Sequence, residues 1–251
     1  MSSARRSIEE VSDPSANFML NPARPGPGIC PTCWTFHDPA YGQCYRCRSQ
    51  PRIADVVVPI TYSIGLEQMH YLLRRYKEGA TAEVEARFQL QLAAVLWRFL
   101  RSHEACVAAA CGAESFELVT VVPSGTVARD DIRPRLRQIA GEMVGQTAER
   151  FARLLAPTDS TVPGHQYDPN RFRARKSLDG SSVLLIDDTW TTGASIQSAA
   201  CALKVAGAPR IGVVVIGRHI NREYGDNAGH LKALPRPFDW ATCAVHHLGS
   251  R

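Results

Sequence analysis

The chain has 251 residues, of which 45% are hydrophobic and 21% charged, and its net charge is +5 with the histidines neutral. A chain of this length can bury a substantial core without a disulfide framework. No run of about 18 apolar residues occurs, which excludes a membrane-spanning helix. Residues 1–28 contain no apolar stretch typical of a secretory signal, so we expect a cytoplasmic protein. The excess of Lys and Arg is smaller than in dedicated nucleic-acid-binding proteins.

The first part of the chain is predicted to hold a tail, a cysteine-rich segment and two helices. Residues 1–28 are punctuated by proline and glycine without a period, which predicts disorder. Residues 29–62 contain a cysteine cluster and then an apolar, β-branched run at 53–62 that suits a strand. Two amphipathic helices should follow. Their apolar faces are Leu66, Met69, Leu73 and Tyr76 in the first, and Val84, Phe88, Leu92, Val95, Leu96 and Phe99 in the second.

From residue 117 onward, strands and helices are predicted to alternate. The expected strands are 118–122, 183–186 and 211–216. The expected helices are a long one with Ile132, Leu136, Ile139, Met143 and Leu154 on one side, and a small-residue helix over 196–206. Residues 157–180 read as a long polar loop, and 221–251 show no clear pattern. This alternation predicts an α/β fold with a parallel sheet, and we assign residues 63–251 to that domain.

The segment VLLIDDTWTTGAS, residues 183–195, carries the most chemical information. A buried strand leads into two carboxylates, Asp187 and Asp188, and then into a hydroxyl-rich turn that opens a helix. Backbone N–H groups in such a turn form an anion site, and glycine allows close backbone approach. Adjacent carboxylates suit sugar hydroxyls or Mg²⁺. The segment therefore describes a cradle for a ribose 5-phosphate, although a polar turn with capping hydroxyls and surface acids would share several of these residues.

This segment resembles the phosphoribosyl pyrophosphate (PRPP) signature of type I phosphoribosyltransferases. The resemblance implies that Asp187 and Asp188 are the catalytic acids and hold the ribose 2′- and 3′-hydroxyls. It also implies that the turn wraps the 5-phosphate, and that Mg²⁺ accompanies PRPP. The turn residues are Thr189, Thr191, Thr192, Gly193, Ala194 and Ser195. Trp190 stands where the signature varies, and no role is assigned to it.

Two Cys-x-x-Cys pairs, Cys30/Cys33 and Cys44/Cys47, are separated by ten residues. Such pairs can present four thiolates tetrahedrally to Zn²⁺. We favour a structural zinc ribbon over a redox role, because a redox Cys-x-x-Cys is a single motif beside a βαβ unit. His37 could replace a ligand. The aromatic residues of this segment could cover the metal or, together with Arg46 and Arg48, stack on nucleic acid.

The other four cysteines, Cys106, Cys111, Cys201 and Cys243, lack this spacing and are interpreted as buried or incidental thiols. Cys243 could join His246 and His247 in a second metal site, but adjacent histidines near a terminus are more often simply exposed.

A zinc ribbon before a phosphoribosyltransferase domain resembles the ComF family of competence-associated, phosphoribosyltransferase-like proteins. Tyr76-Lys77-x-Gly79 resembles that family's segment between the ribbon and the catalytic fold, and the shared order of elements covers about residues 30–217. The resemblance implies a type I phosphoribosyltransferase domain preceded by a small four-cysteine zinc ribbon and a helical insert.

The pyrophosphate leaving group would be held by the loop after the first core strand, through Ser124 and Gly125. ComF members usually carry Arg-Gly-Phe-Asn-Gln just after this loop, whereas this chain has Arg-Asp-Asp-Ile-Arg-Pro-Arg at 129–135. The departure puts the grip on pyrophosphate and the choice of acceptor in doubt. In related enzymes a mobile loop closes over the site. The basic loop 163–180 would do so here with Arg171, although a charge run is more often a solvated face.

Three functions follow from these patterns. The first is a phosphoribosyltransferase that passes ribose 5-phosphate from PRPP to a nitrogenous acceptor and releases pyrophosphate. Its acceptor would be read by the segment around 218–230. The second is a non-catalytic PRPP- or nucleotide-binding accessory protein of DNA uptake. The third is nucleic-acid binding through the ribbon and the basic loop. A homodimer is compatible with each of them.

Overall fold

The computed structural model describes residues 6–79, 81–124 and 134–246. Its centre is a four-stranded, fully parallel sheet in the order β1-β6-β5-β2. These strands are β1 (Val56–Ile64), β2 (Leu118–Val121), β5 (Val183–Trp190) and β6 (Ile211–Ile220). The α/β class and the parallel sheet are confirmed. Because the strands are parallel, their carboxyl ends lie at one edge of the sheet, where open α/β sheets bind ligands.

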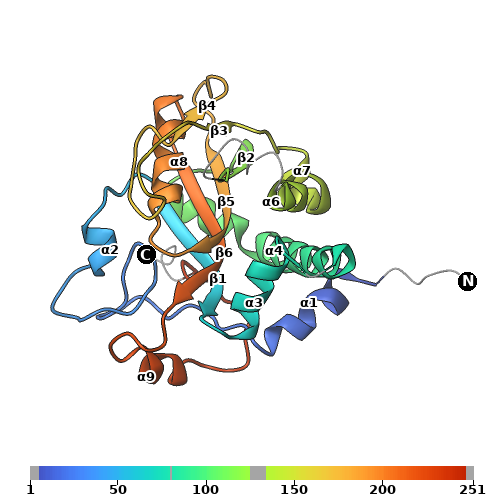
Figure 1. The fold of residues 1–251 in the computed structure, drawn as a ribbon, viewed down its shortest axis with the longest axis vertical. Helices are drawn as coiled ribbons and strands as arrows, with labels where there is room; N and C mark the ends of the chain where they lie inside the picture. The colour runs from blue at the N-terminus through green and yellow to red at the C-terminus, as the bar shows by residue number, and fades with distance from the viewer. Residues whose placement is uncertain (1–5, 80, 125–133, 247–251) are drawn as a thin grey trace, which may run out of the picture.

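Helices cover both faces of the sheet (Figure 1). One face packs against α4 (Ala82–Cys111), and the other packs against α8 (Ala194–Val205). Side chains alternate between the two faces along each strand, as the two-residue period of a strand requires. In β5, Leu184 and Ile186 pack on the α4 side, whereas Val183 and Leu185 pack on the α8 side. All four side chains are fully buried, which explains why the strand reads as a continuous apolar run.

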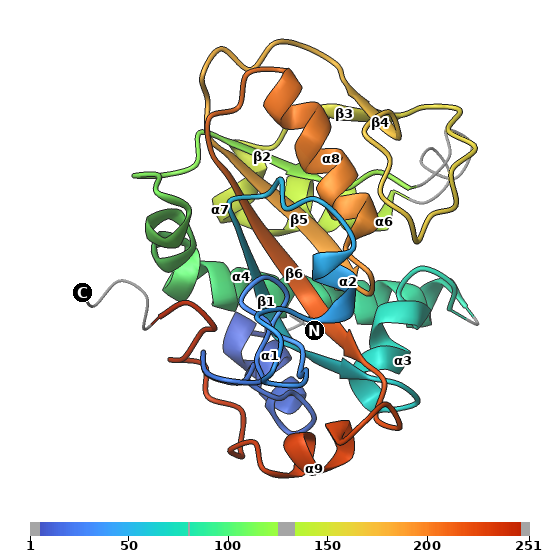
Figure 2. The same cartoon turned by 90° about the vertical axis from the view of Figure 1, so that its left-hand side faces the viewer.

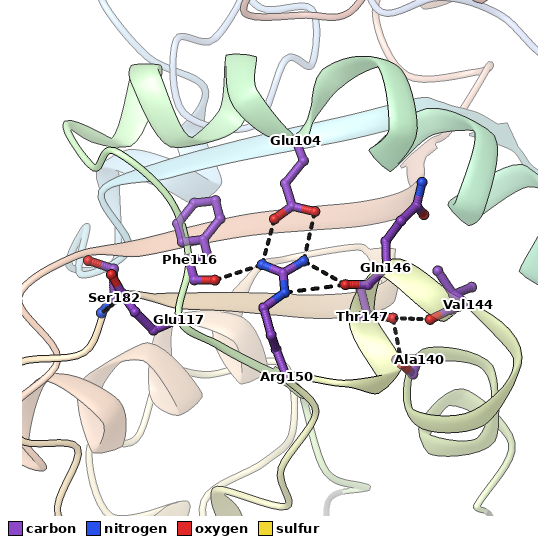
Figure 3. A network of polar contacts seen from close by, with 9 residues as sticks. All are labelled: Glu104, Phe116, Glu117, Ala140, Val144, Gln146, Thr147, Arg150 and Ser182. Carbon is purple, nitrogen blue, oxygen red and sulfur yellow. Dashed lines mark hydrogen bonds and ion pairs between the residues drawn. The ribbon is translucent and has the colours of Figure 1, made fainter.

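An arginine clamp joins α4 to the segment that precedes the small hairpin (Figure 3). The Arg150 guanidinium pairs with both carboxylate oxygens of Glu104 on α4, at 2.7 and 3.0 Å. It also donates to the carbonyl oxygens of Phe116 at 2.6 Å and of Gln146 at 2.7 Å. A bidentate pair fixes orientation as well as distance. This clamp therefore sets the position of the short helices relative to α4.

The predicted long helix around Ile139 is wrong. The described chain there forms α6 (Arg135–Gln138), a π-helix η1 (Ile139–Met143) and α7 (Gly145–Ala148). Gly141 lies against the ring of Phe151, where a Cβ would come within 2.7 Å of a ring carbon, so close packing rather than helical periodicity shapes this segment. Leu154 is buried outside any helix, and Ile132 lies outside the described residues.

The predicted disordered tail is also corrected, over residues 6–28. Helix α1 (Ile8–Ala16) begins with a capping box, in which Ser7 Oγ accepts from the Glu10 N–H and the Glu10 carboxylate accepts from the Ser7 N–H. Arg98 and Gln91 of α4 donate to the buried hydroxyls of Ser12 and Ser15. Met19 and Leu20 then enter the core. The Ser-x-x-Glu spacing was the overlooked sign of this helix.

Three other predicted segments have different boundaries in the structure. Residues 56–62, assigned above to the ribbon, belong to the central sheet, because β1 pairs along its length with β6. Helix α3 (Gln68–Arg75) begins after Leu66, which is fully exposed at φ 66° and not part of an apolar face. The loop 157–180 contains a strand that pairs antiparallel with its neighbour. The remaining elements are α2 (Tyr45–Arg48), β3 (Leu155–Pro157), β4 (Phe172–Ala174) and α9 (Asn227–Lys232).

No helix within residues 6–79, 81–124 and 134–246 has both the length and the apolar character needed to cross a membrane.

Candidate functional site

A four-cysteine centre lies on the α8 side of the sheet. Cys30 and Cys33 precede a turn through Trp34, and Cys44 and Cys47 flank the start of α2. Their four sulfur atoms lie within 4.8 Å of one another, and all four residues are buried. The Sγ atoms of Cys33 and Cys44 are 3.7 Å apart. In a tetrahedral site with Zn–S bonds of about 2.3 Å, sulfur atoms are about 3.8 Å apart.

The donor set therefore fits a metal such as zinc. Hydrogen bonds among the four thiols lower the pKa of Cys30 and raise that of Cys47, so a bound metal would have to displace the remaining thiol protons. His37, the alternative ligand, is not part of the cluster. Four thiolates leave no open coordination position, which is the pattern of a structural site.

A buried arginine links this centre to the carboxyl end of β5. Arg218 of β6 is 5% exposed, and its Nε donates to the Cys33 carbonyl at 2.9 Å. Its Nη1 donates to the carbonyls of Trp190 and Thr191 at 3.1 and 3.3 Å, and its Nη2 approaches Cys33 Sγ at 3.5 Å. Arg218 lies in the segment predicted to read the acceptor, but its donors instead hold residues 29–54, the cysteine lobe, against the turn 191–195. A lone cation in an otherwise apolar strand was the available sign.

A second set of bonds joins the same two parts. Gln50 donates through its side-chain amide to the Thr192 carbonyl at 2.5 Å. The Gln197 side chain on α8 accepts from the backbone N–H groups of Ile53 and Ala54 at 2.7 and 3.0 Å. These hydrogen bonds therefore hold the cysteine lobe against the turn that leads into α8 (Figure 2).

The two predicted acids lie within the last residues of β5, because the strand runs four residues beyond Ile186. Asp187 pairs in register with Val215, and the following Thr189 pairs with Gly217. Strand alternation sends the side chains of Asp187 and Asp188 to opposite faces. This arrangement differs from the expected turn directly after Ile186, and its cause is continued pairing with the longer β6.

Asp188 has two partners from the segment that follows α3. Its Oδ2 accepts a hydrogen bond from the Tyr76 hydroxyl and forms an ion pair with Lys77. Tyr76 is fully buried, and Asp188 is 5% exposed. Burial and the neighbouring carboxylate raise the pKa of Tyr76 well above its ordinary value, so its hydroxyl stays protonated and donates. These contacts give a structural use to the Tyr76-Lys77 pair, which sequence reasoning had noted only as a resemblance and an apolar face.

The surroundings of Asp187 are less favourable for a charged carboxylate than those of Asp188. Its Oδ1 accepts from the Asp188 N–H at 2.9 Å. Burial, and then the negative charge of Asp188, raise the pKa of Asp187 well above its ordinary value, while Lys77 opposes the shift. A bound cation beside these carboxylates would relieve the same repulsion.

The turn after β5 has a conformation that only its own residues allow. Gly193 has φ 85° and stands directly before α8. A Cβ on Gly193 would collide with the indole ring of Trp190, which is 1% exposed. The Thr192 hydroxyl accepts from the Ala194 N–H at 3.3 Å. Thr191 is exposed, and Ser195 lies half-buried in the first helical turn. Trp190, to which no role was assigned above, therefore packs its indole ring against Gly193 of the turn.

Three cavities border these residues. The smallest, of about 110 Å³, brings Ser124 together with Asp187 and Asp188, and Arg135 and Arg137 line it too. The second, of about 350 Å³, lies beside Asp188, Thr189 and Thr191. The smallest cavity thus brings together the ends of β2 and β5, which were predicted to bind one ligand.

The third cavity, of about 610 Å³, lies between the cysteine lobe and the turn. It is lined by Thr191 and Thr192 on one side and by the residues after β6 on another. Its walls include Tyr45 and Tyr224, which are 66% and 70% exposed, and Tyr41, whose ring lies 4.2 Å from the Arg48 guanidinium carbon. Flat aromatic surfaces beside cations suit a planar or anionic ligand.

Arg171 is not part of this arrangement. It is 4% exposed, and its Nη2 donates to the carbonyls of Val162, Pro163 and Gln166 at 3.1, 2.9 and 2.9 Å. Its guanidinium closes its own loop and lines none of the three cavities. The structure therefore does not bring Arg171 together with Asp187 and Asp188. Gly125, the other residue predicted beside Ser124, lies outside the described residues.

No protein-family model matches this chain, and no curated protein matches it in a sequence search.

Proposed function

We propose that this protein binds PRPP together with Mg²⁺ and transfers its ribose 5-phosphate to a nitrogenous acceptor, with release of pyrophosphate. The observation that carries the proposal is the pair Asp187 and Asp188 at the carboxyl end of β5, directly before a hydroxyl-rich turn that opens α8. Carboxylates there can meet a sugar and its cation, while the turn can meet a phosphate.

Each part of PRPP then has a matching surface. The 5-phosphate would lie against the turn of Thr191 to Ser195 at the start of α8, whose helix dipole favours an anion. The pyrophosphate would lie in the cavity that Ser124 shares with the two acids, beside Arg135. Arg135 also pairs with Glu85 at 2.5 Å, which holds its guanidinium in place.

The acceptor would enter from the large cavity between the cysteine lobe and the turn. This cavity is lined by the segment after β6, including Asn221 and Tyr224, which matches the part of the chain expected to read the acceptor. In the transfer, the acceptor nitrogen bonds to C1 of the ribose as the C1–O bond to pyrophosphate breaks. The protein contributes orientation and charge stabilisation to this step.

A binding function without transfer is the second candidate. Arg171 is engaged with backbone carbonyls away from the site, so the basic loop supplies no cation to pyrophosphate through this residue. A protein that senses PRPP or a nucleotide needs the cradle but not the stabilisation of a leaving group.

Calorimetric titration of PRPP with and without Mg²⁺ tests the shared part of both candidates. We expect Mg²⁺-dependent binding to the wild type, a loss of at least about tenfold in affinity in Asp187→Asn and Asp188→Asn, and no change in Asp159→Asn. Tenfold in affinity corresponds to about 1.4 kcal/mol. Asp159 is exposed and lines none of the three cavities, so it is a matched control. Absence of binding to the zinc-loaded wild type would refute both the transfer of ribose 5-phosphate from PRPP and a PRPP-sensing role.

A measurement of pyrophosphate release distinguishes the transferase from the binding protein. We expect release from PRPP in the presence of a nucleobase or amine acceptor, and a lower kcat/KM for that acceptor in Tyr224→Ala with unchanged PRPP affinity. PRPP binding without release for any acceptor tested would favour the binding protein.

A further inference from the structure

A second cluster of metal-binding side chains lies far along the sequence from the four-cysteine centre. His103 and Cys106 are three residues apart on α4, and Cys243 and His246 are three residues apart near the end of the described chain. Four potential ligand atoms from these residues lie within 4.8 Å of one another. Two pairs at this spacing, one from each segment, form a set of two thiols and two imidazoles. The structure thus adds His103 and Cys106 to the Cys243 and His246 that were predicted as a possible second metal site, and His247 lies outside the described residues.

The four ligand atoms lie close enough together for small side-chain adjustments to bring them to the separations of a tetrahedral zinc site. With Zn–S and Zn–N bonds of about 2.3 and 2.0 Å, neighbouring ligand atoms are about 3.3–3.8 Å apart. Cys106 Sγ lies 3.8 Å from His246 Nδ1. The corresponding distance between two ligands of the four-cysteine centre is 3.7 Å. The two clusters are therefore equally compact.

The protonation of His103 gives an independent reason. Its Nε2 lies 2.8 Å from the Trp240 carbonyl oxygen, which can only accept, so Nε2 carries the proton. Nδ1 then carries a lone pair. Within the described part of the chain, this buried Nδ1 has no hydrogen-bond partner. A buried acceptor without a partner is costly, whereas a histidine that donates one ring N–H to a carbonyl and offers the other nitrogen is the usual state of a metal ligand.

The surroundings favour a permanent rather than a reactive site. His103 and Cys243 are each 3% exposed, while His246 is the exposed member of the set. Four protein ligands leave no position for water or substrate. Two thiolates neutralise the charge of Zn²⁺, so the buried side of the site needs no further counter-ion.

We propose that His103, Cys106, Cys243 and His246 hold a second, structural zinc ion that fastens the carboxyl-terminal segment to α4. The segment has few regular backbone bonds of its own, yet Phe238, Cys243, Ala244 and Val245 are buried in the core beside α4. Asn21 exchanges hydrogen bonds with the backbone of Asp239 at 2.7 and 2.9 Å, which ties the amino-terminal segment to the same place. The ion would therefore secure residues 238–246 on α4, and Asn21 would tie the amino-terminal segment to them.

Metal analysis of the untagged, reduced full chain tests this proposal. We expect two zinc ions per chain in the wild type, one in Cys106→Ser, one in His246→Asn, and two in Cys201→Ser. Cys201 is a half-buried helical cysteine like Cys106 but belongs to neither cluster, so it is a matched control. His246→Asn changes an exposed side chain and keeps the test valid if Cys106→Ser fails to fold.

Cobalt substitution identifies which site each variant loses. Cys106→Ser and His246→Asn should keep the spectrum of a four-thiolate site, whereas Cys30→Ser should keep that of a site with two thiolates and two imidazoles. One zinc ion per wild-type chain, or two ions retained in both Cys106→Ser and His246→Asn, would overturn the proposal. A Cys106–Cys243 disulfide that persists after treatment with a reductant, seen as a mass lower by two hydrogen atoms, would do the same.

Discussion

The adjacent acids of β5 should respond in opposite directions to the same substitution. Asp188 is stabilised in the ligand-free protein by the Tyr76 hydroxyl and by Lys77. Asp187 is half-buried beside that charge, and its pKa is raised. We therefore expect Asp187→Asn to stabilise the ligand-free protein at neutral pH and Asp188→Asn to destabilise it, although both should weaken PRPP binding.

The sign for Asp187 follows from proton linkage. A raised pKa means that the folded state holds the proton more tightly than the unfolded chain does, so ionisation costs the wild type stability as pH rises through that raised pKa. A tenfold change in the proton affinity of one carboxyl corresponds to about 1.4 kcal/mol, or about 3–6 °C in Tm for a chain of this size. Asp187→Asn, which cannot ionise, should therefore have a higher Tm than the wild type at pH 8, and the difference should shrink toward pH 5.

The magnitude for Asp188 comes from the buried hydroxyl of Tyr76. An asparagine oxygen can still accept from this hydroxyl, but a neutral acceptor is weaker than a carboxylate by about 1–2 kcal/mol. Lys77 is 36% exposed, so its ion pair adds little. Asp188→Asn should then lower Tm by about 2–8 °C at pH 5, whereas at pH 8 the relief of repulsion on Asp187 offsets part of this loss.

Thermal denaturation of the two variants and the wild type between pH 5 and pH 8 measures both effects. Comparison at each pH cancels the protonation of the zinc ligands, which all three proteins share. If Asp187→Asn is no more stable than the wild type at pH 8, or if both variants shift in the same direction, the account of the two carboxylates is refuted.

Three further changes test the residues that hold the site in place. Gly193→Ala should lower the free energy of unfolding in urea by about 1–3 kcal/mol, because its Cβ would meet Trp190 at a positive φ. Gly164→Ala, in open space, should change this free energy by less than about 0.5 kcal/mol, and equal effects of the two substitutions would contradict the argument. Arg218→Met should cost about 2–3 kcal/mol and speed the loss of zinc to a chelator, whereas the exposed Arg222→Met should do neither. Removal of zinc from the wild type should shift tryptophan emission to longer wavelength as buried Trp34 becomes exposed, and zinc addition should reverse it; unchanged emission would argue against a structural metal.

Local patterns in the sequence correctly predicted the elements whose structure is determined by their own residues. The runs 183–186 and 211–216 are strands because β-branched and aliphatic side chains suit a sheet that is buried on both faces. The two Cys-x-x-Cys pairs predicted a compact four-thiolate cluster, because three-residue spacing brings paired ligands together whatever surrounds them. The parallel sheet likewise followed from the alternation of strands and helices.

Contacts between segments distant in the sequence determined the features that local patterns did not predict. The donors of Arg218 and Tyr76 reach residues 185 and 112 positions away, so no local pattern could assign their partners. The helix that replaces the predicted tail is stabilised by packing on α4, and Arg171 turned to carbonyls of its own loop instead of to the acids. Cys106 and His246, one from each pair of the second cluster, lie 140 residues apart. Each pair alone is ordinary, and only the packing of the chain's end on α4 brings them to metal-binding distance. Spacing in a sequence determines which side chains share a turn, whereas the closure of long loops around a common core determines which turns meet.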